Sequence, residues 1–193
     1  MTLKTSRRSF LAGASAVTGF LFVGMGAGKS WAAAPSATDI NPFIRIDQDG
    51  TVTAIIKHFE MGQGTTTGLT TLIAEELDAD WETTQIDFAP ADNKRYANLA
   101  FGAQGTGGST AIANSFMQYR KAGAAAREIL IQAAAIKWGV SPDVIQVKKG
   151  VLSHGGKKAH FGEMIAKAAT LTPSKEPKLK STADFKLIGN PDL

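Results

Sequence analysis

The sequence predicts an α+β domain with hairpin strands, a short helix and one long helix. Three observations support this fold class. Residues 43–59 contain two β-branched, apolar segments around a turn rich in Asp and Gly, which is typical of a β-hairpin. Apolar residues recur at helical spacing in residues 65–77 and 109–138. Further strand-like segments lie at 84–88 and 144–152, but strands and helices do not alternate regularly, as they would in a parallel α/β sheet.

The first hairpin follows a linker. Residues 33–41 are polar and contain proline, so we predict no regular structure for them. Residues 43–46 alternate between apolar and polar side chains, and the turn at 47–50 ends in glycine. The second strand spans residues 51–59 and ends before Gly62-Gln63-Gly64.

Two helices follow, separated by the strand at 84–88 and a long loop. The apolar face of the first helix is made by Leu69, Leu72, Ile73 and Leu77. The second helix, at 109–138, is rich in alanine, with Ser109 as its predicted N-cap and Gly139 at its end. The loop at 90–108 has no periodicity, and long loops of this kind in compact domains are functional or disordered.

Three regions divide the chain: a leader at residues 1–34, a folded domain at 35–172, and a final region at 173–193 that begins as a Lys- and Pro-rich linker. Within the domain, a short helix at 161–169 follows the hairpin at 144–152. An acidic run is predicted to be a solvated helix end: Glu75, Glu76, Asp78 and Asp80. Three lysines are predicted to be exposed in the linker: Lys175, Lys178 and Lys180.

Charge and cysteine content exclude several functions. The net charge of +4 comes from the leader, where Lys4, Arg7, Arg8 and Lys29 precede the first acidic residue, Asp39. The other 17 of the 21 basic residues match 17 acidic ones, so we expect no basic face and no nucleic-acid partner. The chain has no cysteine, which excludes disulfides, Cys-ligated zinc and iron–sulfur clusters within it.

The leader has the pattern of a twin-arginine signal peptide. Residues 6–11 contain the arginine pair, an apolar stretch follows at 11–27, and small residues favour cleavage after Ala32 or Ala34. We therefore expect export to the periplasm and no stable membrane span after cleavage, with a membrane anchor as the alternative. Since the twin-arginine route carries folded proteins that often hold a cofactor, we expect a bound cofactor.

The first candidate site is the glycine-rich segment between the strand at 51–59 and the helix that begins at Thr65. The first N–H groups of this helix, together with its dipole, favour an anionic group. Gly62 and Gly64 have no Cβ, so a bulky ligand could approach the backbone closely. The Gln63 amide between them could donate to an oxygen that carries partial negative charge.

The second candidate site, at residues 102–110, runs into the start of the long helix. Successive N–H groups in such a loop can form a nest for an anion. Two loops of this kind indicate one large anionic ligand or two anionic groups, and ordinary tight turns are the alternative. A nicotinamide-binding domain is a further alternative, because Gly62, Gly64 and Gly68 follow a strand and Asp87 lies about 20 positions further on. The spacing of these glycines is, however, one residue longer than in the dinucleotide-binding fingerprint.

A more specific resemblance is carried by two blocks of sequence. The first is Glu60-Met61-Gly62-Gln63-Gly64-Thr65-Thr66-Thr67-Gly68-Leu69, followed by Ala74-Glu75-Glu76-Leu77-Asp78-Ala79-Asp80-Trp81. The second is Thr106-Gly107-Gly108-Ser109-Thr110, followed by Arg120, Ala122-Gly123-Ala124 and Ala126-Arg127. Together with the leader, these blocks resemble the molybdopterin-binding large (beta) subunits of the xanthine dehydrogenase/aldehyde oxidase family, of the isoquinoline 1-oxidoreductase type.

The resemblance implies that the chain folds as the N-terminal part of the first molybdenum-cofactor-binding domain. The cofactor that it implies is molybdenum–molybdopterin cytosine dinucleotide. It implies oxidation of aldehydes or N-heterocycles with water as the oxygen donor. Gln63 becomes the candidate catalytic residue, beside the metal and donating to its oxo group. The cofactor-binding residues implied are Gly62, Gln63, Gly64, Thr65, Gly107, Gly108, Ser109 and Thr110. Pterin sulfurs hold molybdenum in this family, so no protein metal ligand is expected.

The implied partners are a [2Fe-2S] small subunit, the remainder of the large subunit and an electron acceptor such as a cytochrome. Family large subunits are far longer, so the chain resembles an N-terminal fragment, and we predict that it is inactive alone. Residues 185–189 resemble the entry to a hammerhead-like domain, which makes 173–193 a linker and the start of that truncated domain. The family's general-base glutamate lies downstream, and neither Glu60 nor Glu75 matches it. A non-catalytic periplasmic remnant is the remaining alternative.

Overall fold

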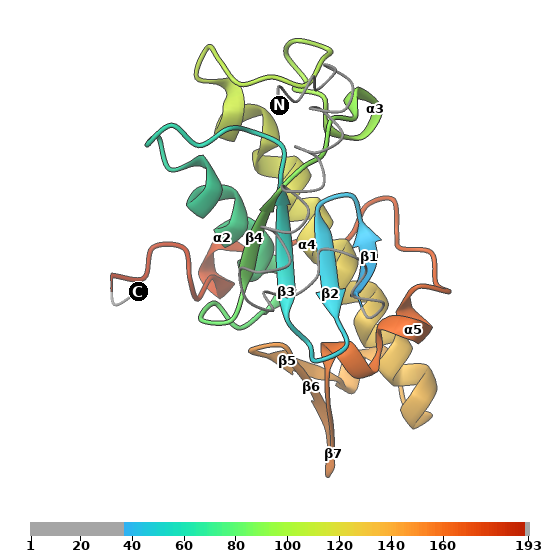
Figure 1. The fold of residues 1–193 in the computed structure, drawn as a ribbon. Helices are drawn as coiled ribbons and strands as arrows, with labels where there is room; N and C mark the ends of the chain where they lie inside the picture. The colour runs from blue at the N-terminus through green and yellow to red at the C-terminus, as the bar shows by residue number, and fades with distance from the viewer. Residues whose placement is uncertain (1–36, 192–193) are drawn as a thin grey trace, which may run out of the picture. The chain divides into compact units, whose positions relative to one another are not determined.

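The computed structural model describes residues 37–191, and the predicted leader at 1–34 lies outside the described residues. The described part contains a four-stranded sheet, two main helices and a separate three-stranded sheet (Figure 1). This confirms the predicted α+β class. None of the helices in this part is both long enough and apolar enough to cross a membrane.

The four-stranded sheet has the order β1 (Ala37–Asn41), β2 (Ile44–Asp47), β3 (Val52–Ile56) and β4 (Gln85–Phe88). The first three strands are antiparallel, which confirms the predicted hairpin, whereas β4 is parallel to β3. Residues 37–41 were predicted to be linker but form an edge strand, because backbone pairing with β2 outweighs their weak local preference.

One face of this sheet is apolar on three neighbouring strands. The register places Ile44 beside Ala54, Ala54 beside Ile86, and Ile56 beside Phe88, so these side chains point to the same side. Ile44, Ala54 and Ile56 are buried in the core, whereas Ile86 and Phe88 keep 45% and 51% of their surface exposed. The apolar face therefore continues onto β4 beyond the edge of the core.

The helical spacing correctly predicted α2 (Thr65–Leu77) and α4 (Thr110–Trp138), and the two helices pack closely against one another. A Cβ added at Gly123 would lie only 2.9 Å from the Ile73 carbonyl oxygen and 2.9 Å from Cβ of Glu76. Only glycine therefore lets α4 approach α2 this closely. Gly139 ends α4 in a left-handed conformation, as expected.

The second sheet consists of β5 (Gln146–Lys148), β6 (Val151–His154) and β7 (Lys157–His160), all antiparallel. The predicted hairpin at 144–152 is β5–β6, and the predicted short helix appears as a 3-10 turn followed by α5 (Ile165–Ala168). Strand β7 was not predicted, because only Ala159 of its four residues is buried and it has no apolar alternation. Between β4 and α4, the long loop contains the short helix α3 (Asn93–Tyr96).

The C-terminal segment at residues 178–188 is not a free linker, because it packs against the end of α2. The Lys180 side chain is only 7% exposed, and its Nζ donates to the Glu75 carbonyl oxygen at 2.5 Å and to Asp78 Oδ1 at 2.9 Å. The prediction of an exposed Lys180 was therefore wrong. The predicted solvation of Glu75 and Glu76 was also wrong, since both side chains are almost completely buried.

Buried carboxylates persist here because each has several donors. Glu75 Oε2 accepts backbone N–H groups from Lys186, Leu187 and Ile188 at 2.9, 2.6 and 3.1 Å. Glu76 accepts from Arg120 Nε at 2.7 Å and from the Lys180 backbone N–H at 3.0 Å. The acidic run is thus the anchor for the C-terminal segment.

Candidate functional site at two helix starts

The loop before α2 is organised by Glu60, a residue to which the sequence analysis gave no role. Its Oε1 accepts backbone N–H groups from Gly62 at 2.8 Å and Gly64 at 3.0 Å. Its Oε2 accepts from the backbone N–H and the hydroxyl of Thr66 at 2.9 and 3.0 Å. The carboxylate therefore fills the N-terminus of α2 from within the chain.

This corrects the expectation that the start of α2 offers free N–H groups to an anionic ligand. The N–H groups of Thr66 and Gly64 stabilise the charged form of Glu60 most strongly and lower its pKa to about 2. At neutral pH a ligand anion here would meet a negative carboxylate that already uses these donors. The same argument removes support for a dinucleotide pyrophosphate at this loop, and Asp87 forms an ion pair with Arg45 at 3.3 Å.

Gln63 lies on the exposed side of this loop with its amide folded back onto it. The Gln63 Nε2 donates to the Phe59 carbonyl oxygen at 2.7 Å, and Oε1 accepts the Met61 N–H at 2.5 Å. Gly62 and Gly64 have positive φ angles of 89° and 77°, and a Cβ added at either would meet nothing within 4 Å. Both glycines are therefore required by the turn itself. Thr65 is completely buried, so its hydroxyl does not reach the loop surface.

The second loop is organised by Asn98, whose side chain is buried in the long connection. Its Nδ2 donates to Thr110 Oγ1 at 2.8 Å and to the Gly105 carbonyl oxygen at 3.2 Å. Thr110 Oγ1 donates in turn to the Gly107 carbonyl oxygen at 2.7 Å. These side-chain contacts fix the chain that enters α4, and the N–H of its first residue, Thr110, donates to the Gly107 carbonyl oxygen at 3.2 Å.

The start of α4 carries no side-chain cap. Ser109 occupies the N-cap position with a left-handed φ of 54°, and its side chain makes no capping hydrogen bond. The predicted position of the cap is thus confirmed, but the predicted capping role is wrong, because this backbone conformation differs from the extended one that side-chain caps require. Gly108 and Ser109 are both exposed, so the start of α4 is accessible.

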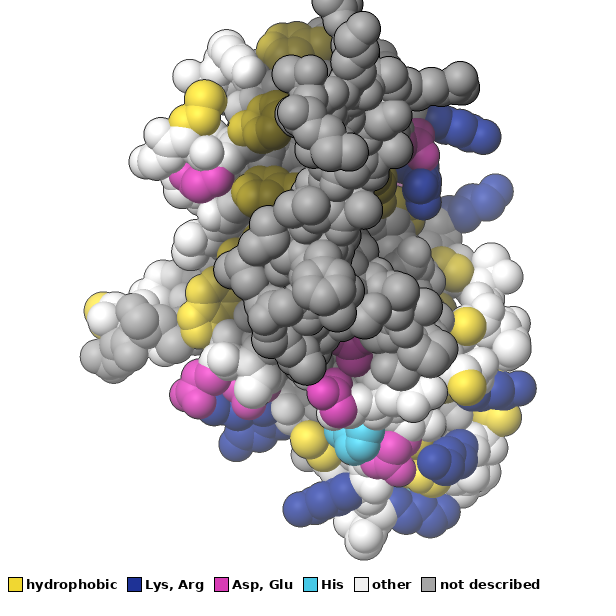
Figure 2. Space-filling model, in the orientation of Figure 1, with side chains coloured by type: hydrophobic (Ala, Val, Ile, Leu, Met, Phe, Trp, Pro, Cys, Tyr) yellow, Lys and Arg dark blue, Asp and Glu magenta, His cyan; other side chains and the backbone are white. Residues whose placement is uncertain are grey.

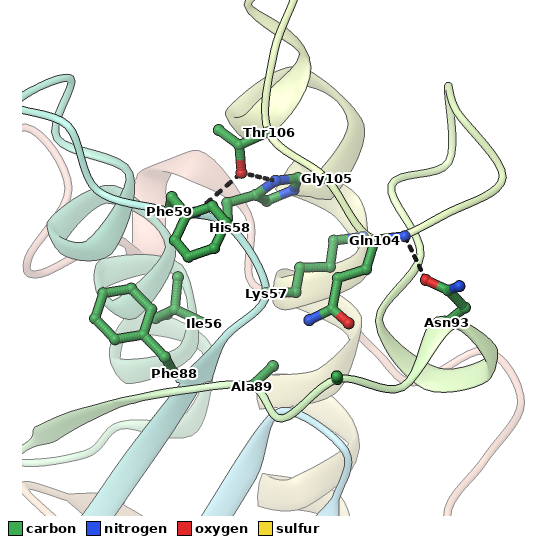
Figure 3. A pocket seen from close by; sticks show the side chains of 11 residues that line it. Ile56, Lys57, His58, Phe59, Phe88, Ala89, Asn93, Gln104, Gly105 and Thr106 are labelled. Carbon is green, nitrogen blue, oxygen red and sulfur yellow. Dashed lines mark hydrogen bonds between the residues drawn. The ribbon is translucent and has the colours of Figure 1, made fainter.

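Thr106 joins the two loops. Its Oγ1 accepts the Phe59 N–H at 2.9 Å and lies 3.3 Å from Nδ1 of His58 (Figure 3). The other ring nitrogen of His58 lies 3.0 Å from Ser115 Oγ on α4. Burial and the neighbouring Lys57 lower the pKa of His58, so the ring is neutral at pH 7 and holds both loops on α4.

A cavity of about 390 Å³ lies beside these loops, at the carboxyl ends of β3 and β4. Phe59 and Phe88 line one side of it and Gln104 the other (Figure 3). Lys57 also lines it and is buried, with Nζ donating to the Ala97 carbonyl oxygen at 2.9 Å and to Gln118 Oε1 at 2.6 Å. Burial lowers the pKa of Lys57 below its ordinary value.

Among residues 37–191, no group of three or more His, Asp or Glu side chains is arranged to hold a metal ion. Of the predicted site residues, the structure brings Gly107, Gly108, Ser109 and Thr110 together at an accessible helix start. Gln63 lies in the other loop, where its amide is hydrogen-bonded to Phe59 and Met61. The two loops are joined by the Thr106 hydroxyl, which contacts both Phe59 and His58.

Comparisons with known proteins define the class. Residues 6–192 match the profile of the molybdopterin cofactor-binding domain family. The chain therefore belongs to this family, the cofactor-binding domains of xanthine dehydrogenase-type molybdenum hydroxylases. The predicted resemblance is confirmed at this level.

Individual relatives sharpen the match. Isoquinoline 1-oxidoreductase subunit beta of Brevundimonas diminuta is 38% identical over 173 residues, which are 86% of this chain and 22% of that protein. Membrane-bound aldehyde dehydrogenase (pyrroloquinoline-quinone) of Gluconacetobacter polyoxogenes is 34% identical over 197 residues, which are 91% of this chain and 25% of that protein. The chain thus spans a quarter or less of these relatives and is a partial cofactor-binding domain.

A solved structure shows the same fold. The crystal structure of quinoline 2-oxidoreductase from Pseudomonas putida 86 matches with a TM-score of 0.50 and 24% identity, over 66% of this chain and 16% of that chain.

Proposed function

We propose that this chain is the phosphate-holding part of a molybdenum hydroxylase large subunit, and that the start of α4 is its anion site. One contrast carries the proposal. The start of α2 is filled by the Glu60 carboxylate, whereas the start of α4 has no side-chain cap and is entered through exposed Gly108 and Ser109. Helix starts of this kind bind phosphate groups through N–H donors and the helix dipole.

The residues at the start of α4 fit the phosphates of a molybdopterin dinucleotide, whereas Gln63 is turned toward its own loop. The cofactor's phosphates match the N–H groups of exposed Gly108 and Ser109 in charge and hydrogen bonding, while the Thr110 N–H donates to the Gly107 carbonyl oxygen at 3.2 Å. The cofactor, when bound, supplies the redox chemistry that hydroxylates an aldehyde or N-heterocycle with oxygen from water. Gln63 keeps its proposed role of donating to the metal's oxo ligand only if its amide turns away from Phe59 and Met61.

The proposal includes partners outside this chain. A [2Fe-2S] small subunit would carry electrons away, because the chain has no cysteine to hold a cluster. An acceptor such as a cytochrome would take them, and the rest of the large subunit would supply the general base. Export by the twin-arginine route and the cytosine form of the dinucleotide are likewise proposals, supported by the leader and by the resemblance.

The test uses pyrophosphate and amide resonances of the full chain. We expect pyrophosphate to shift residues 107–111 selectively and to leave 62–66 unchanged. Gly108→Asp places a carboxylate at the site and weakens binding by roughly tenfold or more. Gly155→Asp is the matched control, since Gly155 is also exposed and left-handed but lies in the turn between β6 and β7, outside both loops. Selective shifts at 62–66, or none at either loop, would contradict the proposal.

Assembly provides a second test. Co-expression with a complementing large-subunit piece and a [2Fe-2S] subunit should give bound molybdenum by metal analysis. Gln63→Ala should lower turnover of that assembly by roughly 10²- to 10³-fold while molybdenum content is kept. Unchanged turnover would remove Gln63 from the mechanism without affecting the phosphate site.

A further inference from the structure

Strand β4 presents an apolar row that the described part of the chain does not cover. All four of its residues are exposed, and Ile86 and Phe88 lie on the same face, half exposed. We call these two side chains the β4 row. They extend the buried face formed by Ala54 and Ile56 on β3, so the row has the character of an interrupted core. Figure 2, in the orientation of Figure 1, shows hydrophobic side chains at the surface in its left half.

The backbone of β4 also offers an edge. It is the last strand of the sheet in residues 37–191 and pairs only with β3. The Ala89 N–H donates to the Ile56 carbonyl oxygen, so by the alternation of a parallel ladder the Ile86 and Phe88 backbone groups point outward. Asp87 Oδ1 accepts the Phe88 N–H at 2.8 Å, which leaves the Ile86 N–H and the Ile86 and Phe88 carbonyl groups along this edge.

A socket lies at the end of the row. The cavity of about 390 Å³ is lined by Phe88, Phe59 and Ile56, and Phe59 is itself 71% exposed. A cavity of this size can take a large apolar side chain. An open edge, an apolar row and a socket therefore form one continuous surface that fits an extended apolar segment.

We infer that this surface seats a strand from the remainder of the large subunit, which pairs with β4, covers the row and places an apolar side chain in the socket. The inference rests on the proposed function. Two observations favour this occupant. Relatives contain at least three times as much chain beyond the matched part, since 22% and 25% of their lengths are matched. The row also continues the core of the domain on the same sheet face, as expected where a fold is completed by its own subunit.

The experiment measures binding between the full chain and a separate polypeptide, the part of the Brevundimonas diminuta relative that lies outside its match. We expect a complex in which amide hydrogens of residues 85–88 exchange more slowly. Ile86→Arg and Phe88→Arg should each weaken it by roughly tenfold or more. Ile136→Arg is the control, since Ile136 is 56% exposed and lies on α4. Thermal melts verify that each variant folds, and we expect folding to be kept because the substituted side chains are about half exposed.

Each outcome decides the matter. A complex whose affinity is unchanged by both β4 variants overturns the docking surface and leaves the proposed function intact. Failure to form any complex also overturns it, and the pyrophosphate titration then shows separately whether the proposed function fails. If the β4 variants instead abolish self-association, the occupant is a second copy. If residues 85–88 are already protected in the full chain but not in one that begins at residue 35, the leader is the occupant.

Discussion

Replacing Glu75 by alanine tests the idea that one buried carboxylate anchors the C-terminal segment. The substitution removes the acceptor of the Lys186, Leu187 and Ile188 N–H groups and a partner of Lys180 Nζ at 3.1 Å. Removing one partner of a buried ionic network typically costs about 3–5 kcal/mol, because the donors left behind stay buried without acceptors. Release of the segment into water limits this loss, so we expect about 3 kcal/mol in the free energy of unfolding.

Two measurements distinguish anchoring from general damage. Urea denaturation gives the loss of stability, and amide hydrogen exchange shows where it occurs. We expect residues 186–188 to lose their protection while the α2–α4 core keeps it. Glu82→Ala is the control, because Glu82 is exposed in the turn after α2, and it should change stability by less than about 0.5 kcal/mol.

The stabilisation that Glu75 contributes should depend on pH in a defined direction. Burial alone would raise the pKa of Glu75, but the Leu187, Ile188 and Lys186 N–H groups lower it below its ordinary value of 4.5. A carboxylate with a lowered pKa contributes stability above its unfolded pKa and loses it as pH falls through the folded pKa. The difference between wild type and Glu75→Ala should therefore shrink below about pH 4.5. A variant that keeps protected 186–188 amides and loses less than about 1 kcal/mol would refute the anchor.

Other substitutions test other parts of the fold. Glu60→Gln should speed amide exchange at residues 62–66. In the wild type, the protection of these amides should fade as pH falls from 4.5 to about 2, since the pKa of Glu60 is lowered in the folded state. Protection that does not change over this pH range would contradict capping by Glu60. Gly123→Ala should lower stability by about 1–3 kcal/mol in thermal melts. Gly156→Ala is the control and should not lower it, since a Cβ added at Gly156 meets nothing within 4 Å. Equal effects of the two substitutions would argue against tight packing of α4 on α2. Asn98→Ala should cost about 1–3 kcal/mol and weaken pyrophosphate binding, and unchanged binding would separate Asn98 from the loop's function.

Local periodicity predicted the main elements well. The helices at 65–77 and 109–138 and both hairpins follow from spacing and turn residues, because those signals are contained in short stretches. The strand at 37–41 and strand β7 were missed, since their pairing depends on partners and not on their own composition.

The candidate site was predicted in outline only. Both glycine loops were located, but the sequence did not show that Glu60 fills one of them, although Glu60-x-Gly62 before a helix start is a signal that could have been used. The burial of Glu75 and Lys180 was out of reach, because their contact joins residues 105 positions apart. Charge runs in a sequence indicate solvent only when no distant segment packs on them.

The carboxylate at the start of α2 has a consequence for assembly. Because the Glu60 carboxylate accepts the Gly62, Gly64 and Thr66 N–H groups, the backbone of this loop is held by the chain's own hydrogen bonds and needs no ligand to fix it. Under the proposed function, conformational entropy is lost mainly at the start of α4 when the ligand binds, which favours binding at low ligand concentration. Under the proposed function, the two glycine-rich loops therefore differ in role: the loop before α2 is a scaffold and the start of α4 binds the ligand.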